Sequence, residues 1–295
     1  MSSAGRDPSE IVRRALVEDL GADDLAVAHD VTSTFALPEG QRGRGEIRAK
    51  AEGVLAGVEC AVLAFRMLDA AARVEPQLRD GAALAPGDCV IRFEGAMAPL
   101  LAAERTALNF LQRLSGVATR TRSFVDAVAG TGARILDTRK TTPGLRHLEK
   151  AAVVSGGGEN HRIGLFDQVL LKENHFGFAR PKAYADVVEQ CRAGQPRPVI
   201  AEARTVEEAV AAVDGGASVV LLDNFEAGPS LQQAVAAVRA RAAEVGREVE
   251  TEASGGIVLA NVRSYAECGV DRISVGSLTH SAPAIDLSMV VEGVE

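Results

Sequence analysis

The pattern of apolar and polar positions along the chain changes near residue 133. Before that point, apolar residues at helical spacing predict helices within 8–21, 57–72 and 99–130. Alternating residues interrupted by glycine predict strands and a turn within 44–57, and a turn followed by a strand within 80–95. The first part of the chain is therefore expected to mix long helical structure with a few strands.

After residue 133, short apolar strands alternate with amphipathic helical stretches. Six strands are expected, within 133–140, 167–174, 197–203, 218–224, 248–256 and 271–276. This alternation predicts an α/β fold whose parallel strands are joined by crossover helices. Continuous apolar runs such as 219–222 indicate strands that are covered on both faces. The pattern favours an α/β barrel over an open doubly wound sheet.

Cationic residues follow the first of these strands. Arg139 and Lys140 come directly after the apolar residues 135–136. A guanidinium can bind a carboxylate through two parallel hydrogen bonds, whereas an ammonium is a compact charge suited to phosphate. A solvated loop is the usual explanation for such cations, but their place at the end of an apolar strand weakens it. The cluster therefore predicts a site for a small anion.

The following segment offers further candidates. Lys172 ends the second strand, and His161 beside Arg162 is expected to be a neutral hydrogen-bonding group rather than an acid. The glycine triplet 156–158 could let the backbone approach an anion, although a flexible turn is its commoner role. The two Asn-His pairs in this segment do not make a metal site by their spacing.

Carboxylates and glycines occupy the remaining strand ends, which form the rim where barrels build their sites. Glu202 and Asp223 each end an apolar strand, and rim salt bridges to Lys140 or Lys172 would explain them structurally. Functionally, they could hold sugar hydroxyls, bind Mg²⁺ indirectly, or face a developing positive charge. The glycine-rich turns within 252–257 and 273–281 offer backbone N–H groups typical of a phosphate site, with close turn packing as the alternative.

Composition limits the partners of this 295-residue chain. A net charge of −8 and 4% aromatic residues argue against a general nucleic-acid binder. The four cysteines lie far apart, which predicts reduced thiols and neither zinc nor disulfides. No apolar run approaches the ~20 residues that span a bilayer, and the N-terminus lacks a hydrophobic signal core. A cytoplasmic location without a membrane partner is expected.

Together these motifs resemble the signature blocks of the quinolinate phosphoribosyltransferases. The resemblance covers most of the chain, and its blocks lie at 104–119, 136–150, 156–175, 221–225, 252–257 and 273–289. It implies transfer of phosphoribose from 5-phosphoribosyl-1-pyrophosphate to quinolinate, which yields nicotinate mononucleotide, pyrophosphate and CO₂, with Mg²⁺, in de novo NAD synthesis.

The resemblance also implies a fold and an assembly. An N-terminal α/β sandwich, 1–115, would be joined by the C-terminal segment 278–295, and a seven-stranded α/β barrel would occupy 116–277. Because the pattern gives six barrel strands, 151–158 is the candidate for the seventh. Active sites would be completed across a homodimer.

Roles for single residues follow from the same resemblance. Arg139, His161 and Arg162 would hold the quinolinate carboxylates, with Thr138 and Lys172 nearby. The spacing of Arg105 alone predicts a solvated cation on a helix. By the resemblance, it would instead reach into the active site of the neighbouring subunit. Lys140 and Lys172 would face pyrophosphate, and Glu202 and Asp223 the ribose hydroxyls and the metal-bound region. The 5-phosphate would be bound by the turns that contain Ser254, Gly255, Gly256, Val275, Gly276 and Ser277. Arg146, His147 and Lys150 are instead expected to be loop or interface charges.

Two departures and three alternatives accompany this interpretation. Glu173 stands where the family pattern suggests Asp, and the segment 21–33 is longer than the family's compact N-terminal element. The first alternative is a relative of the same fold, either the paralogue associated with molybdenum transport or a nicotinate-specific transferase. The second is a barrel lyase or aldolase with Lys140 or Lys172 as Schiff-base nucleophile. The third is a non-catalytic module that binds a phosphate ligand. The pairing of Arg139 and Arg162 with His161 favours a dicarboxylate substrate.

Overall fold

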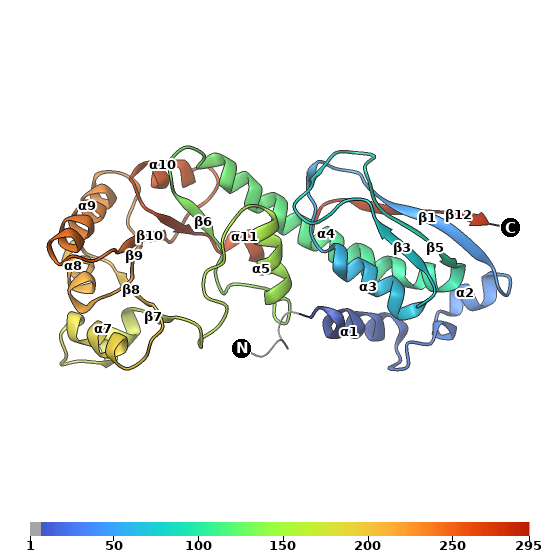
Figure 1. Cartoon of the computed structure of the whole chain (residues 1–295), viewed down its shortest axis with the longest axis horizontal. Coiled ribbons are helices and arrows are strands. Elements are labelled where there is room, and N and C mark those ends of the chain that lie inside the picture. The colour runs from blue at the N-terminus through green and yellow to red at the C-terminus, as the bar shows by residue number, and fades with distance from the viewer. Residues whose placement is uncertain (1–6, 295) are drawn as a thin grey trace. The chain divides into compact units, whose positions relative to one another are not determined.

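The computed structural model describes residues 7–294, which form two compact units (Figure 1). The first unit contains the chain up to Arg122, Thr141–Gly157 and the residues from Thr279 onward. The second unit contains Ser123–Lys140 and Gly158–Leu278. The segment 141–157 therefore packs with the first unit, whereas the sequence-based division assigns it to the barrel domain. No helix among residues 7–294 is long and apolar enough to cross a membrane.

The first unit is built on an antiparallel sheet of four strands in the order β12-β1-β5-β3. Its strands are β1 (Arg42–Ala49), β3 (Arg73–Pro76), β5 (Cys89–Ala96) and β12 (Leu287–Val294). The short strands β2 (Gly53–Val54) and β4 (Ala83–Leu84) pair separately. Because β12 pairs with β1 along its whole length, the end of the chain completes the sheet of the first unit.

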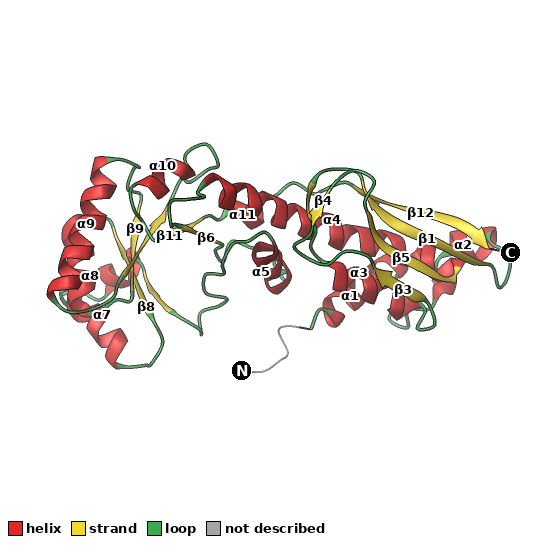
Figure 2. Ribbon diagram, turned by 45° about the horizontal axis from the view of Figure 1, so that its top comes forward, coloured by secondary structure: helices red, strands yellow, loops and turns green. Residues whose placement is uncertain are grey.

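Helices cover one face of this sheet (Figure 2). They are α1 (Ser9–Leu20), α3 (Val58–Leu68) and α4 (Met97–Ala127), which confirms the three helices predicted in this part. Helix α1 buries Val12 and Leu16 and ends at Gly21, whose φ of 70° closes the helix in the left-handed region. The apolar side of β5, with Ile91 and Phe93 buried, faces these helices, and Phe93 stacks on Phe65 of α3. This packing forms the core of the first unit.

The long segment 21–33 has structure of its own. It contains the single turn η2 (Val27–His29) and leads into α2 (Val31–Ala36). The side chain of Asp30 caps α2 by accepting the backbone N–H groups of Thr32 and Ser33. The segment is therefore a capped helical connection.

The second unit contains a parallel sheet in the order β6-β11-β10-β9-β8-β7, which confirms the six predicted strands. They are β6 (Arg134–Leu136), β7 (Val169–Leu171), β8 (Val199–Ala203), β9 (Val219–Asp223), β10 (Glu250–Ser254) and β11 (Arg272–Ser274). In both views, α7 (Tyr184–Ala193), α8 (Val206–Gly215) and α9 (Pro229–Glu244) cover one face of the strands β7 to β10. The α/β class and the parallel sheet are thus confirmed, and closure into a barrel stays a prediction.

The candidate for a seventh strand is wrong. Residues 151–155 belong to helix α5 (Arg146–Ser155) of the first unit, where Ala152 and Val153 are buried. The chain becomes extended only beyond the helix, where Glu159 forms a single parallel bridge with Leu136 of β6. The remaining helices are α6 (Glu173–Phe178), α10 (Val262–Glu267) and α11 (Ser277–His280).

Candidate active site

The predicted site residues of the second unit lie where the parallel strands end, at their carboxyl ends. Thr138, Arg139 and Lys140 follow β6, and Lys172 follows β7. Glu202 lies near the end of β8, and Asp223 and Ser254 are the last residues of β9 and β10. Val275 and Gly276 follow β11, and Ser277 begins α11. Parallel strands end at the same edge of a sheet, so these groups share one edge.

Lys172 and Glu202 form the central ion pair of this edge. The Lys172 ammonium lies 2.9 Å from Glu202 Oε2, and the backbone N–H of Glu173 donates to Oε1 at 3.1 Å. Glu202 is 7% exposed, whereas half of the Lys172 side chain faces solvent. The hydroxyl of Tyr184 donates to the backbone carbonyl of Glu202 at 2.6 Å. Glu202 is therefore held by Lys172, by the backbone of Glu173 and by Tyr184, and the Lys172 ammonium stays partly exposed to solvent.

Asp223 lies within electrostatic reach of this pair. Burial and the negative charge of Glu202 raise the pKa of Asp223, although the cations Lys172, Arg204 and Lys140 oppose the shift. Its Oδ2 accepts the side-chain amide of Asn224 at 2.8 Å. Two carboxylates that disfavour each other's charge would be stabilised together by a cation or by a positively charged group between them. Glu202 and Asp223 could therefore bind a positively charged group.

Two arginines form the opposite electrostatic feature. Burial, and after it the positive charge of Arg139, lower the pKa of Arg162. Arg162 Nη1 also donates to the backbone carbonyl of Gln168 at 3.3 Å. Two guanidinium groups that repel each other in a partly buried place are stabilised by an anion, and their planar forks match carboxylates.

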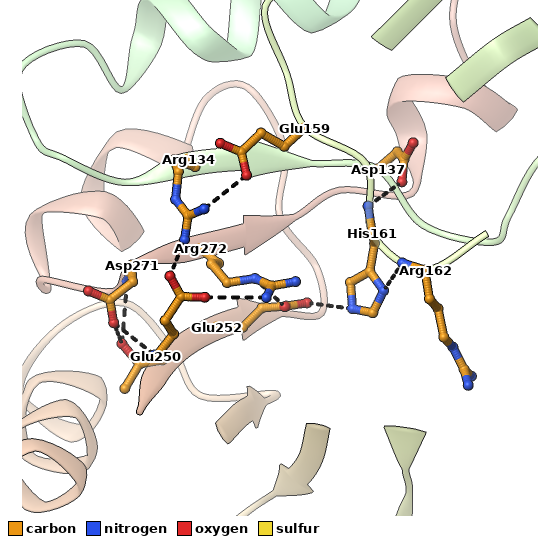
Figure 3. A network of polar contacts seen from close by, with 10 residues as sticks. Arg134, Asp137, Glu159, His161, Arg162, Glu250, Glu252, Asp271 and Arg272 are labelled. Carbon is orange, nitrogen blue, oxygen red and sulfur yellow. Dashed lines mark hydrogen bonds and ion pairs between the residues drawn. The ribbon is translucent and has the colours of Figure 1, made fainter. Parts of the chain in front are cut away.

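His161 is buried, and Figure 3 shows its ring between the backbone of Arg162 and Glu252. Its backbone N–H donates to Asp137 Oδ1 at 2.8 Å, and its Nδ1 accepts the backbone N–H of Arg162 at 2.7 Å. Its Nε2 lies 3.3 Å from Glu252 Oε1. Both ring nitrogens therefore contact protein groups. Because Nδ1 accepts a hydrogen bond, it carries no proton, which is the arrangement of a neutral imidazole.

The turn after β10 requires glycine. Gly255 has a φ of 99°, and a Cβ at this position would lie 2.7 Å from Asn224 Oδ1. Asn224 itself has a φ of 60° and donates its backbone N–H to the carbonyl of Ser254 at 3.2 Å. The ends of β9 and β10 are thus joined by a tight pair of turns, in which close packing alone explains Gly255.

Several predicted residues do not join this group. Arg105 lies on α4 in the first unit, with its side chain 60% exposed. Arg146, His147 and Lys150, expected to be loop or interface charges, lie on helix α5 rather than in a loop, and Lys150 is buried. Their place in an interface stays a prediction. Gly156 is explained by packing within the first unit, because a Cβ there would lie 2.3 Å from the carbonyl oxygen of Ala118 on α4.

In the second unit, the sequence interpretation missed two buried carboxylates, Asp137 and Glu252. Asp137 was overlooked because the cations Arg139 and Lys140 follow it closely. Glu252 had a usable signal: Glu250 and Glu252 are two residues apart, so both point to the same face of a strand that should be covered. A carboxylate inside such a strand needs a partner, and that requirement could have been used to find it.

The acidic groups also limit how a metal could be held. Among residues 7–294, no group of three or more His, Cys, Asp or Glu side chains could hold a metal ion. Glu202 and Asp223 provide two neighbouring carboxylates, and one of them already pairs with Lys172. This donor set fits Mg²⁺ that is bound through one or two carboxylates and substrate phosphates, rather than in a protein cage.

Comparisons with known proteins identify the family. The models for the N-terminal and C-terminal domains of quinolinate phosphoribosyl transferase match residues 30–115 and 117–290. The nicotinate-nucleotide pyrophosphorylase (carboxylating) of Mycobacterium leprae is 40% identical over 288 residues, covering 95% of each chain. A probable enzyme of the same name from Bacillus subtilis is 38% identical over 287 residues, covering 96% of this chain and 92% of the relative. The crystal structure of NadC from Streptococcus pyogenes superposes with a TM-score of 0.87 at 34% identity, covering 98% of this chain and 97% of the other. The chain belongs to the quinolinate phosphoribosyltransferase family.

Proposed function

We propose that this enzyme transfers the phosphoribosyl group of 5-phosphoribosyl-1-pyrophosphate to quinolinate and releases pyrophosphate and CO₂. The product would be nicotinate mononucleotide, an intermediate of NAD biosynthesis. The observation that carries the proposal is the shared edge of the parallel sheet, which brings together two neighbouring arginines, two lysines and two carboxylates. Quinolinate is a dicarboxylate and its co-substrate carries several phosphate charges, so such an edge suits both substrates.

Arg139 and Arg162 would bind the carboxylates of quinolinate, with Thr138 and His161 beside them. Burial and, after it, repulsion by Arg139 lower the pKa of Arg162, and a bound dianion would relieve that repulsion, which supports this assignment. Nicotinate, which has one carboxylate, would leave one arginine without a partner. This difference favours quinolinate over nicotinate as the acceptor.

Lys140 and Lys172 would face the pyrophosphate, and Glu202 and Asp223 would face the ribose. The turns with Ser254, Gly255, Gly256, Val275, Gly276 and Ser277 would bind the 5-phosphate through backbone N–H groups. Mg²⁺ would be held mainly by the substrate, near Glu202 and Asp223, and would neutralise phosphate charge when bound. Positioning and electrostatic stabilisation would supply most of the catalysis.

The reaction follows from these positions. As the C1–O bond to pyrophosphate breaks, its electron pair leaves with the phosphate, and Lys140 and Lys172 stabilise that charge. The sugar develops positive charge at C1, which Glu202 and Asp223 stabilise, and the pyridine nitrogen attacks it. The alkylated ring then accepts the electrons of the C2–carboxylate bond. CO₂ departs, and the carbon it leaves takes up a proton.

The assembly is also part of the proposal. We infer a homodimer in which Arg105 of one subunit enters the active site of the other, because its exposed side chain lies outside the unit that holds the remaining residues. A cytoplasmic location stays a prediction.

One assay tests the reaction. The protein is incubated with 5-phosphoribosyl-1-pyrophosphate, Mg²⁺ and quinolinate labelled at the 2-carboxylate, and the released CO₂ is measured. We expect CO₂ and nicotinate mononucleotide in equal amounts, and no mononucleotide when nicotinate replaces quinolinate. Mononucleotide formed from nicotinate without CO₂ release from quinolinate would reject the proposed function.

A further inference from the structure

A chain of charged side chains runs across the sheet of the second unit and ends at His161 (Figure 3). Glu252, on β10, is fully buried. One of its carboxylate oxygens lies 3.1 Å from Arg272 Nε on the neighbouring strand β11, and the other lies 3.3 Å from His161 Nε2. Neither contact is aligned as a strong hydrogen bond, and the Ser274 side chain also favours the ionised form of the carboxylate.

Glu252 is ionised in this environment. Burial by itself would raise the pKa of Glu252, but His161 and Arg272 outweigh burial and hold that pKa below its ordinary value. A buried carboxylate is costly unless its neighbours compensate it. Arg272 is shared with Glu250, which lies 3.4 Å from its Nη1 and also pairs with Arg134. Arg272 therefore divides its charge between two carboxylates, and the ring of His161 is the second group that faces Glu252.

The contacts of His161 determine its tautomer. The backbone N–H of Arg162 donates to Nδ1, so the ring proton must be on Nε2, the nitrogen that faces Glu252. A neutral imidazole with the other tautomer would place an N–H against the N–H of Arg162 and a lone pair against the carboxylate. The negative charge of Glu252 therefore favours the tautomer that binds the Arg162 backbone.

Residues 161–162 are also held by a second contact, on the side of β6. The backbone N–H of His161 donates to Asp137 Oδ1, at the end of β6. Since β11 separates β6 from β10, residues 161–162 are tied to two strands that are not neighbours. Arg162, the next residue, extends from a backbone that is fixed through the His161 ring.

We propose that Glu252 is a positioning residue for the dicarboxylate pocket: it selects the tautomer of His161, and His161 in turn holds the backbone from which Arg162 reaches the substrate. This inference rests on the proposed function, because that function assigns Arg162 to quinolinate. Glu252 itself does not touch the substrate, and its effect should appear in the binding of quinolinate rather than of 5-phosphoribosyl-1-pyrophosphate.

Steady-state kinetics of Glu252→Gln test the effect on binding. The amide keeps the size of the side chain but removes the charge and can present a donor to His161. We expect KM for quinolinate to rise on the order of tenfold, the change typical of losing a contact that orients a ligand-binding side chain. KM for 5-phosphoribosyl-1-pyrophosphate should not change. An unchanged KM for quinolinate, or an equal rise in both constants, would overturn the proposal.

Glu250→Gln is the matched control. Glu250 is on the same strand and also contacts Arg272, but it has no contact with His161. This variant should change thermal stability while leaving both KM values at those of the wild type. If it raised KM for quinolinate as much as Glu252→Gln, the effect would belong to the charge network as a whole and not to the tautomer.

A double-mutant cycle tests the route through His161. In His161→Asn, the side-chain oxygen can still accept the Arg162 N–H, but the shorter side chain does not reach Glu252. Adding Glu252→Gln to this variant should then change KM for quinolinate little further. A full additional rise would show that Glu252 acts by another route. Should Glu252→Gln not fold, Glu252→Met with Arg272→Met removes the acceptor without leaving a buried cation alone, and the same rise in KM is expected.

Nitrogen NMR of the histidine rings gives a readout that does not depend on activity. The chain has 5 histidines, so comparison with His161→Asn assigns the signals of His161. At neutral pH, the wild type should show a protonated Nε2 and an unprotonated Nδ1, and Glu252→Gln should show a mixture of tautomers. A protonated Nδ1 in the wild type would overturn the inference. If the wild type releases no CO₂ from quinolinate, the proposed function fails, and the tautomer spectra still decide the role of Glu252.

Discussion

At the scale of single residues, Arg139 and Lys140 carry the proposed anion binding. We expect Lys140→Ala or Arg139→Ala to lower turnover by about 10²–10³-fold, because each removes a charge that faces a substrate anion. The thermal unfolding midpoint should change little, because Arg139 is only partly buried and Lys140 is exposed. Lys50→Ala, which removes an exposed cation of the first unit, is the control and should keep wild-type turnover. Near-normal rates in either site variant would contradict the assignment.

Asp223 gives a prediction that depends on pH. Its pKa is raised in the folded protein, chiefly by burial and then by Glu202, so the folded state binds a proton more tightly than the unfolded state. Stability is then lost as pH rises from the unfolded pKa, about 3.9, through the folded value. Asp223→Asn removes this penalty while keeping an acceptor for Asn224. The variant should unfold about 1–3 °C higher than the wild type at pH 7, and this gap should shrink toward pH 4. A gap that widens toward acid would show the opposite sign.

Residue types at strand ends were predictable, but their pairing was not. Arg139, Lys172, Glu202 and Asp223 could be found because each follows an apolar run, and parallel strands end at one edge. The sequence could not show that Lys172 pairs with Glu202, because such pairing depends on side-chain geometry. Nor could it show that nearby cations only partly offset the raised pKa of Asp223. The contacts of His161 could not be predicted either, because Glu252, which faces its Nε2, is brought close only by the tertiary fold.

At the scale of elements, one buried ion pair joins two helices of the first unit. Glu149 of α5 is fully buried; its Oε1 lies 2.8 Å from Arg113 Nη2 on α4, and its Oε2 accepts the backbone N–H of Thr142 at 3.0 Å. Glu149→Gln should lower the free energy of unfolding by about 1.5–3 kcal/mol, the contribution of hydrogen bonds to a charged group. Thermal unfolding measures this. Glu10→Gln, which breaks only the exposed pair with Arg14, should change the free energy by less than about 0.5 kcal/mol.

Helix α5 also shows where element prediction failed. Residues 151–158 read as a strand because two valines precede a serine and three glycines. In the fold, Lys150, Ala152 and Val153 are buried with Glu149, and this packing stabilises the helix against the local preference. The six parallel strands were predictable because short apolar runs alternate with helical segments, a pattern that indicates a parallel sheet.

At the scale of the whole molecule, the proposed site residues divide unequally between the two units. All but Arg105 belong to the second unit, which holds the parallel sheet. Arg105 lies on α4 of the first unit, with its side chain 60% exposed and its Nη2 3.9 Å from Glu104 Oε1. A cation this exposed contributes little to the stability of its own helix. The proposed role of Arg105 in the active site of the neighbouring subunit can be tested by mixing subunits.

Two inactive variants should restore activity when they form one dimer. We expect Arg105→Ala and Lys140→Ala each to be nearly inactive as homodimers. In a heterodimer purified through two different tags, one site contains both substitutions and the other contains neither, so about half of the wild-type activity should return. Lys140→Ala paired with Lys172→Ala is the control: both residues belong to the second unit, so each site keeps one defect and the heterodimer should stay inactive. If the heterodimer of Arg105→Ala and Lys140→Ala is also inactive, Arg105 serves its own subunit, and sites shared across the dimer are ruled out.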